Sequence, residues 1–562
     1  MERLHVRFNF RILQFCVLGL FCGMQQGMAQ QTARTTALAP SGSCSVTHFH
    51  PTDADTAYTQ HKYSEAGTMY RATLTKNSSD PAAMTGLVLT LLAQNKGTDA
   101  LTIIQKYAKT NPDSSVAQGL LGQVHMRLGD MRDVITYLNQ AIYLDPCNAW
   151  AHFQASHFLY LAGMYASAKS QLDTAYLLAP DNAAITKAWE DSNPPTLKPE
   201  ERIAELKKKL EAPDLSADEH DALLTTLNEL ETNQHGDCQL MTPFTQTTEK
   251  LIPMRTDLTH LPPATEPLEP LQIGILFGVG LDLQINGKHR HFQVDTGASG
   301  LTLSRSVALA AGLTSEMESK LGGIGDKGLA ASYVAHVDDI RIGTLEFKNC
   351  MVQVIENNSG LTVDGLIGTD VFKNYLITLD IPRLQMKLDP LPRRPGDPID
   401  SGSLDTATDM QSMSAPHDRY IAPEMKDWTK IYRVNDQLIV PTQIGNAPPK
   451  LFILDSGASV GLITPEAATQ VSKVATTDAM KITGIGGEVK NVAMANRIEI
   501  TFAGVRQVTK NMVSIDTTNV SDNAGVEISG FIGFPTLRDV TLSLDYRDNL
   551  IHVSYDPKHI LK

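Results

Sequence analysis

Two aspartates in this chain stand in the same local sequence, far apart along the polypeptide. Residues 292–299 read FQVDTGAS and residues 452–459 read FILDSGAS, so an apolar run precedes Asp295 and Asp455, and a hydroxyl residue and a glycine follow each. Two carboxylates held close together share one proton, because two nearby negative charges cannot both form cheaply. One member of such a pair acts as a general base and the other as an acid. We expect Asp295 and Asp455 to form a pair of this kind.

The elements that must position these aspartates are also duplicated. Residues 366–368 read LIG and residues 531–533 read FIG. Between each aspartate and its apolar-glycine element lies a glycine-rich stretch, GGIG at 322–325 and GIGG at 484–487. Short β-branched runs broken by glycine surround these motifs, which is typical of all-β regions. The same three elements in the same order indicate two β lobes.

This duplicated arrangement resembles the retropepsin-like aspartic peptidases over nearly half the chain. The resemblance implies an endopeptidase that activates a water between Asp295 and Asp455, with an optimum on the acid side of neutral pH and with no cofactor and no metal. It implies that four residues support the dyad, the two hydroxyls by hydrogen bonding: Thr296, Gly297, Ser456 and Gly457. It also implies mobile flaps over the substrate, formed by Gly323, Ile324, Gly325, Ile485, Gly486 and Gly487.

Two other chemical interpretations are weaker. Residues 457–461 read GASVG and match the G-x-S-x-G pattern of serine hydrolases. The first copy, GASGL at 297–301, does not match it, so the aspartate is the residue that recurs with its context. The run HRH at 289–291 could suggest metal ligands, but it follows Asn286-Gly287 and is better explained as a polar hairpin turn.

Two alternatives stay open at the level of function and assembly. A binding protein could keep the protease fold without catalysis, and would then be a peptide- or protein-binding module. The lobes could also pair between two chains rather than within one, because each lobe supplies one aspartate and the linker allows either arrangement.

A repeat precedes the β lobes. Pro112, Pro146 and Pro180 recur every 34 residues, each in a turn between helical patterns. Small and apolar residues fall at fixed places in these frames: Leu121, Gly122, Ala141, Ala155, Ala168, Leu172 and Ala175. The pattern resembles tetratricopeptide repeats, which implies an α-solenoid with a concave surface for a protein partner. A passive spacer is the alternative role, and either role leads us to expect that residues 238–562 fold without the repeats.

The N-terminus and the cysteines indicate export. Three arginines precede an apolar stretch at 12–24, and small residues follow near 27–29, as in a cleaved signal peptide; an uncleaved membrane anchor is the alternative. The stretch is too short for a stable membrane span. The mature chain keeps four cysteines, which can pair in three ways: Cys44, Cys147, Cys238 and Cys350. An even number fits an oxidising periplasmic or extracellular compartment.

Charge and composition set the remaining bounds. The net charge is −14 and the chain has no dense basic patch, which argues against nucleic acid as a partner. The resemblance to aspartic peptidases implies a peptide or protein substrate. The run Lys207-Lys208-Lys209 is flanked by glutamates and is expected on a solvated helix face. The fold class is therefore an α-solenoid followed by two all-β, acid-protease-like lobes in a pseudo-twofold arrangement. The expected order is a signal peptide (1–29), a flexible linker (30–52), helical repeats (53–190), a helical connector (191–262), lobe 1 (263–390), a linker (391–427) and lobe 2 (428–562).

Overall fold

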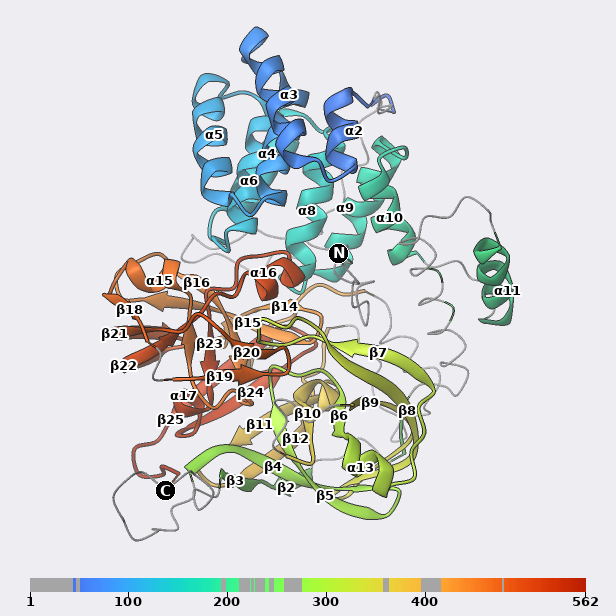
Figure 1. The fold of residues 1–562 in the computed structure, drawn as a ribbon, viewed down its shortest axis with the longest axis vertical. Coiled ribbons are helices and arrows are strands. Elements are labelled where there is room, and N and C mark those ends of the chain that lie inside the picture. Colours follow the sequence, from blue (N-terminus) through green and yellow to red (C-terminus); the bar gives the residue numbers. More distant parts are fainter. Residues whose placement is uncertain are drawn as a thin grey trace.

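The computed structural model places helices on one side of the molecule and two β lobes on the other (Figure 1). It describes residues 44–46, 51–193, 199–211, 223, 227, 238–241, 247–256, 275–356, 363–395, 416–477 and 480–561. The predicted signal peptide and most of the first linker lie outside these residues. In the part of the chain that is described, no helix is long and apolar enough to cross a membrane.

Antiparallel helix pairs form the N-terminal part. The helices are α2 (Asp53–Thr59), α3 (Tyr63–Lys76), α4 (Pro81–Ala93), α5 (Gly97–Thr110), α6 (Ser115–Arg127), α7 (Val134–Leu144), α8 (Ala149–Leu161), α9 (Tyr165–Leu178) and α10 (Ala183–Ser192). Their starts are encoded locally, because the side chains of Ser114, Asn148 and Asn182 accept backbone N–H bonds at the first turns of α6, α8 and α10. A Cβ on Gly122 would lie 2.7 Å from the Leu138 side chain, so this small residue lets α6 approach α7 closely.

The two β lobes share one topology. Lobe 1 has strand order β1-β9-β6-β10-β5-β4-β8-β7, and lobe 2 has the order β14-β15-β16-β23-β17-β22-β21-β18. The central strands correspond in both, with β10 parallel to β5 and β23 parallel to β16. The elements of lobe 1 are β4 (Ile275–Ile285), β5 (Lys288–Asp295), β6 (Leu301–Ser304), α13 (Arg305–Ala310), β7 (Met317–Leu321), β8 (Ala330–Ile342), β9 (Leu345–Ile355), β10 (Gly365–Gly368) and η3 (Thr369–Phe372).

Lobe 2 adds a short hairpin to this topology. Its elements are β14 (Tyr432–Val434), β15 (Gln437–Ile444), β16 (Lys450–Asp455), β17 (Leu462–Ile463), α15 (Pro465–Thr469), β18 (Val474–Thr476), β19 (Ile482–Gly484), β20 (Gly487–Val489), β21 (Ala493–Phe502), β22 (Val505–Ser514), α16 (Thr518–Ala524), β23 (Gly530–Gly533) and α17 (Phe534–Leu537). The hairpin is formed by β19 and β20, which pair with each other as a separate two-stranded sheet.

A third sheet joins the lobes. It runs β13-β25-β24-β11-β12-β2, with bounds β13 (Thr429–Lys430), β25 (Leu550–Tyr555), β24 (Val540–Asp545), β11 (Tyr375–Asp380), β12 (Gln385–Pro390) and β2 (Thr247–Lys250). Strands β11 and β24 are antiparallel at its centre, where Thr378 faces Ser543 with hydroxyl oxygens 3.1 Å apart. One strand from each lobe therefore meets its counterpart across a pseudo-twofold axis, and the lobes pair within one chain.

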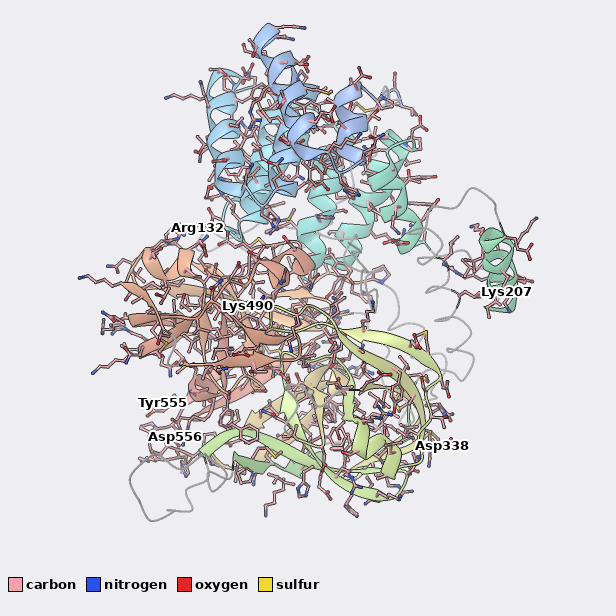
Figure 2. All side chains as sticks on the ribbon, viewed as in Figure 1. Arg132, Lys207, Asp338, Lys490, Tyr555 and Asp556 are labelled. Carbon is pink, nitrogen blue, oxygen red and sulfur yellow. A yellow bond between two sulfur atoms is a disulfide. The ribbon has the colours of Figure 1, made fainter. Side chains whose placement is uncertain are left out.

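The segment expected as a helical connector contains strands as well as a helix. Helix α11 (Pro199–Leu210) is present, and its Lys207-Lys208-Lys209 face is exposed as expected, with Lys207 apart from the main body (Figure 2). Strands β1 (Gln239–Leu240), β2 and β3 (Ile252–Thr256) then pair with β9, β12 and β4. These strands are short and gain their hydrogen bonds from partners distant in sequence, so local periodicity did not indicate them. Within the predicted helical connector, residues 212–237 lie outside the described residues except for 223 and 227.

The repeats pack directly on lobe 2. One apolar cluster contains side chains from α6 to α10 and from strands of lobe 2, and Phe158 of α8 lies 6.0 Å from the ring of Tyr432 on β14. Backbone contacts reinforce this packing, because Glu527 N donates to Arg127 O at 2.9 Å. In Figure 1, α8 and α16 lie at this junction.

Two disulfides connect the helical repeats and lobe 1 to the segments that precede them. Cys44 pairs with Cys147 in the α7–α8 turn, and Cys238 pairs with Cys350 on β9. The first ties a segment before the repeats to them, and the second ties the segment before lobe 1 to that lobe. The sequence left three pairings open, and the fold selects this one.

Candidate active site

The two aspartates end corresponding strands. Asp295 is the last residue of β5 and Asp455 the last of β16. The three residues before each aspartate, 292–294 and 452–454, are buried and, apart from Gln293, apolar. The predicted apolar-glycine elements are the parallel neighbours: Gly368 on β10 is in register with Asp295, and Gly533 on β23 is in register with Asp455. The duplicated motif thus produces two equivalent loops that face each other across the pseudo-twofold axis.

The hydroxyl residues after the aspartates lock these loops together. Thr296 N donates to Ser456 Oγ at 3.0 Å, and Ser456 N donates to Thr296 Oγ1 at 2.9 Å. Each hydroxyl in turn donates across the interface, Thr296 to Leu454 O at 2.8 Å and Ser456 to Val294 O at 2.9 Å. Both side chains are buried, so these bonds are made away from competing water. The sequence motif therefore produces four reciprocal hydrogen bonds at the base of the site.

The carboxyl groups of Asp295 and Asp455 are hydrogen-bonded to each other. Asp295 Oδ1 also accepts from Gly297 N at 2.8 Å, and Asp455 Oδ1 accepts from Ala458 N at 2.8 Å. A Cβ on Gly457 would lie 2.3 Å from an oxygen of Asp295, and one on Gly297 would lie 2.8 Å from the carboxyl carbon of Asp455. Glycine is needed at both positions because each backbone passes directly against the opposite carboxyl group.

The surroundings raise the pKa of both carboxyl groups. Burial raises the pKa of Asp295, and its backbone N–H bonds oppose this. Burial also raises the pKa of Asp455 well above its ordinary value, and the negative charge of Asp295 raises it further. The two carboxyl groups therefore titrate as a coupled pair, which holds a proton more tightly than an isolated aspartate does. A pair that carries one proton has both an acid and a base available.

The predicted flap residues lie in two loops that contact each other. Residues Gly323, Ile324 and Gly325 are in the loop between β7 and β8. Ile485 and Gly486 form the β19–β20 turn, and Gly487 is the first residue of β20. Gly486 N donates to Ile324 O at 2.9 Å, and Lys327 N donates to Gly486 O at 2.9 Å. A Cβ on Gly325 would lie 2.2 Å from the carbonyl carbon of Gly486, so the tips meet backbone to backbone.

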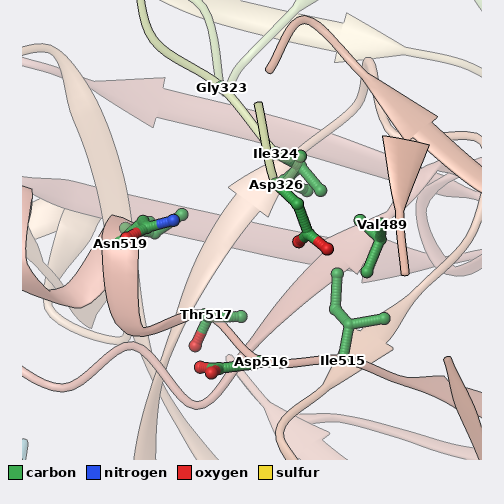
Figure 3. Close-up of a pocket in the computed structure, with 10 residues that line it drawn as sticks. Gly323, Ile324, Asp326, Val489, Ile515, Asp516, Thr517 and Asn519 are labelled. Carbon is green, nitrogen blue, oxygen red and sulfur yellow. The ribbon is translucent and has the colours of Figure 1, made fainter. Parts of the chain in front are cut away.

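Each flap tip packs toward the opposite lobe. Ile324, from lobe 1, joins the apolar cluster of lobe 2, and Ile485, from lobe 2, joins a cluster with Leu366 and Ala298 of lobe 1. A small pocket opens between the first flap and the α16 region, with Ile324 and Asp326 on one wall and Ile515 and Thr517 on the other (Figure 3). The two loops thus contact both lobes and border a pocket lined by polar and apolar side chains.

Two glutamines complete the dyad loops, and the sequence analysis missed both. Gln293 Nε2 donates to Gly457 O, and Gln437 Nε2 donates to Gly297 O, each at 3.3 Å. Gln293 carried a signal, because it is a polar residue in an apolar strand where the second copy has Ile453. Gln437 carried none, because it reaches the loop of lobe 1 from lobe 2.

The alternative chemistries find no support in the geometry. Ser299 and Ser459 both lie on exposed turns, and neither is part of the carboxyl pair. The run 289–291 lies on strand β5 after the Asn286-Gly287 turn rather than in the turn, and His289 Nδ1 contacts Asp282 Oδ2 at 2.7 Å. Over the described ranges, no group of three or more His, Cys, Asp or Glu side chains could hold a metal ion.

Comparison with known proteins agrees with this geometry. Residues 281–371 match the family model described as aspartyl protease, and residues 57–124 match the one described as tetratricopeptide repeat. DNA damage-inducible protein 1 of Neurospora crassa is 31% identical over 115 residues, which is 20% of this chain and 25% of that protein. The chain thus spans about a quarter of the length of this curated relative. The crystal structure of an aspartic proteinase from Irpex lacteus aligns with 56% of this chain and 98% of its own, at 10% identity and a TM-score of 0.31.

The family models classify two parts of the chain: a tetratricopeptide-repeat region at 57–124 and an aspartyl-protease domain at 281–371. The match to the family model covers the first aspartate and ends shortly after β10. The equivalence of the second lobe follows from its strand order and from the register of Asp455 with Gly533.

Proposed function

We propose that this protein is an aspartic endopeptidase that hydrolyses peptide bonds with a water activated between Asp295 and Asp455. The observation that carries the proposal is the carboxyl pair itself, hydrogen-bonded within one chain, with Asp295 buried and Asp455 partly buried. A buried pair of acids is costly to the fold, so its presence with reciprocal hydroxyl support favours a catalytic role over a structural one.

We propose that Asp295 is the base, because it accepts backbone N–H bonds from both dyad loops, and that Asp455 is the acid. Ionised Asp295 takes a proton from the water as its oxygen attacks the carbonyl carbon, and Asp455 gives its proton to the carbonyl oxygen. The resulting tetrahedral diol collapses when Asp295 passes its proton to the amide nitrogen, which leaves as an amine, while Asp455 takes a proton back from a diol hydroxyl and a carboxyl group forms. The N–H groups of Gly297 and Ala458 hold the two carboxyl groups in position through these steps.

The flaps define how a substrate enters. The tips bond to each other in this structure, so a peptide reaches the dyad only after they separate. We propose that an extended peptide then lies between the flaps and the dyad, with its side chains in the apolar places that Ile324 and Ile485 now contact.

Substitution of the dyad tests the proposal. Asp295→Asn and Asp455→Asn should each abolish cleavage of a peptide library, and the double variant should be no worse, because the two groups act as a unit. Folding should survive in the single variants, since an amide has nearly the same shape as a carboxyl group. Circular dichroism and thermal unfolding serve as the control for folding.

The same variants separate the enzyme from a non-catalytic binding module. Full cleavage by either single variant would refute the aspartic mechanism. A wild-type protein that binds a statine-type inhibitor or a peptide but cleaves none would identify the binding module instead.

We also propose that the protein acts outside the cytoplasm. The two disulfides support this proposal, because such bonds persist in oxidising compartments. The repeats are proposed to face a protein partner there. Mass spectrometry of the mature N-terminus in fractionated cells would decide the location, and an intact residue 1 in the cytosolic fraction would refute it.

A further inference from the structure

The turn between β14 and β15 lies between the repeats and the dyad loop of lobe 1. On one side, Arg433 Nη2 donates to the Tyr165 hydroxyl at 2.7 Å, and the guanidinium carbon lies 5.7 Å from the centre of the Tyr165 ring. Tyr165 is the first residue of α9 in the repeats. On the other side, Gln437 donates to the carbonyl of Gly297, two residues after Asp295. A single turn therefore contacts both the helical region and the catalytic loop.

The far end of the same loop is held by Asp370. Gly300 N donates to both oxygens of the Asp370 carboxyl group, at 2.9 and 3.0 Å, and Gly368 N donates to Gly300 O at 2.8 Å. The loop from Asp295 to Gly300 is thus fixed at one end by Gln437 and at the other by Asp370.

Titratable groups from three elements face Asp370. Burial raises the pKa of Asp370 to about 7 and Asp436, in the β14–β15 turn, adds to this, while the Gly300 bond and Lys373 oppose it. Tyr546 lies on the third side, and its hydroxyl contacts Thr369 Oγ1 at 2.6 Å. Arg433 interacts electrostatically with Asp436, so its positive charge offsets the carboxylate that disfavours ionised Asp370.

We propose that the helical repeats position the dyad loop of lobe 1 through this turn, with Tyr165, Arg433, Asp436 and Gln437 as positioning residues. This inference rests on the proposed function in that the positioned loop carries Asp295. Tyr165 holds Arg433 beside Asp436, Arg433 offsets the charge of Asp436, and Asp370 then keeps its hold on Gly300. The repeats are in this respect a part of the active-site support and not a passive spacer.

The Gly300 amide signal in full-length protein labelled with 15N-glycine reports the titration of Asp370. Gly300→Asn assigns the signal by its loss, because Asn tolerates the left-handed backbone of Gly300 (φ +62) and an added Cβ there would meet nothing within 4 Å. Asp436→Asn should move the midpoint to lower pH by about one unit, because a nearby negative charge is removed. Arg433→Gln should move it to higher pH, and Tyr165→Phe should move it in the same direction by less.

Kinetics provide the second measurement. Tyr165→Phe and Arg433→Gln should lower kcat about threefold or more and leave KM unchanged, because they displace the loop without touching substrate. Tyr143→Phe is the matched control, since Tyr143 lies in the repeats with 79% of its surface exposed, and it should change neither measurement.

Each outcome decides one of the two proposals. The inference would be overturned if the midpoint of the Gly300 titration stayed unchanged, or if it shifted in the same direction in Asp436→Asn and in Arg433→Gln. It would also be overturned if Tyr165→Phe and Tyr143→Phe gave the same midpoint and the same kcat. A wild-type protein that cleaves no peptide would refute the proposed function instead, while the Gly300 titration would still decide whether the repeats act on the loop.

Discussion

Asp295 and Asp455 carry the same chemical group, yet their contacts differ. Asp295 accepts backbone N–H bonds from both dyad loops and Asp455 only from its own loop, and the charge of Asp295 raises the pKa of Asp455. The sequence motif predicted the pair, because D-T-G and D-S-G each place a carboxyl group beside a turn. It could not predict which aspartate keeps the proton, since that depends on contacts made across the lobe interface.

A pH profile tests this assignment. Cleavage should fall on the acid side as Asp295 takes up a proton and on the alkaline side as Asp455 loses one. Because burial raises the pKa of both groups, both limbs of kcat/KM should lie above the ordinary aspartate pKa of 3.8. A profile that continues to rise as the pH falls below 3.8 would contradict the assignment.

The same shifts make a prediction about stability. A carboxyl group whose folded pKa is raised binds its proton more tightly in the folded state, so its contribution to stability is fully present below the unfolded pKa and is lost as the pH rises through the folded pKa. The free energy of unfolding should therefore fall as the pH rises through the dyad titration. Asp455→Asn removes this titrating group and should flatten that part of the curve in denaturant titrations.

At the scale of elements, the duplicated motifs predicted the strands that end at the dyad and the two flap loops. Local patterns encode these, because an apolar run followed by a glycine turn specifies a strand and its end. Strands β1 to β3 were not predicted, since they are stabilised by β9, β12 and β4 and not by their own pattern. Asp370 was missed for the same reason: only the fold brings it to Gly300.

Substitution of Gly486 tests whether the β19–β20 hairpin acts as a flap. A Cβ on Gly486 would lie 2.7 Å from Gly323 O, so Gly486→Val should keep the tips apart and lower kcat/KM by about tenfold to a hundredfold. The thermal midpoint should stay close to that of the wild type, because the turn lies outside the apolar core. Thr483→Val, on the exposed face of the same hairpin, is the control of equal shape. An equal loss of kcat/KM in Gly486→Val and Thr483→Val would show that the hairpin has only a structural role.

At the scale of the whole molecule, the sequence suggested separable modules, and the structure argues against that view. The expectation that residues 238–562 fold alone treated the repeats as a solenoid with contacts only between neighbouring helices. Their last helices instead share an apolar cluster with lobe 2, which includes Phe531 beside the dyad strand. Sequence periodicity could not reveal this cluster, because it shows that a helix has an apolar face but not what covers that face.

Phe158 tests whether the repeats and lobe 2 unfold as one unit. It is buried on α8 against lobe 2, and Phe158→Ala should lower the free energy of unfolding by about 3 to 5 kcal/mol. Leu177→Ala is the matched control on the neighbouring helix, since Leu177 is 66% exposed and its removal should change stability by less than about 0.5 kcal/mol. Denaturant unfolding followed by tryptophan fluorescence and by cleavage activity should show one coincident transition, shifted in Phe158→Ala. If activity instead kept its wild-type midpoint while the helical signal was lost early, the repeats would be an independent module, and residues 238–562 should then fold alone.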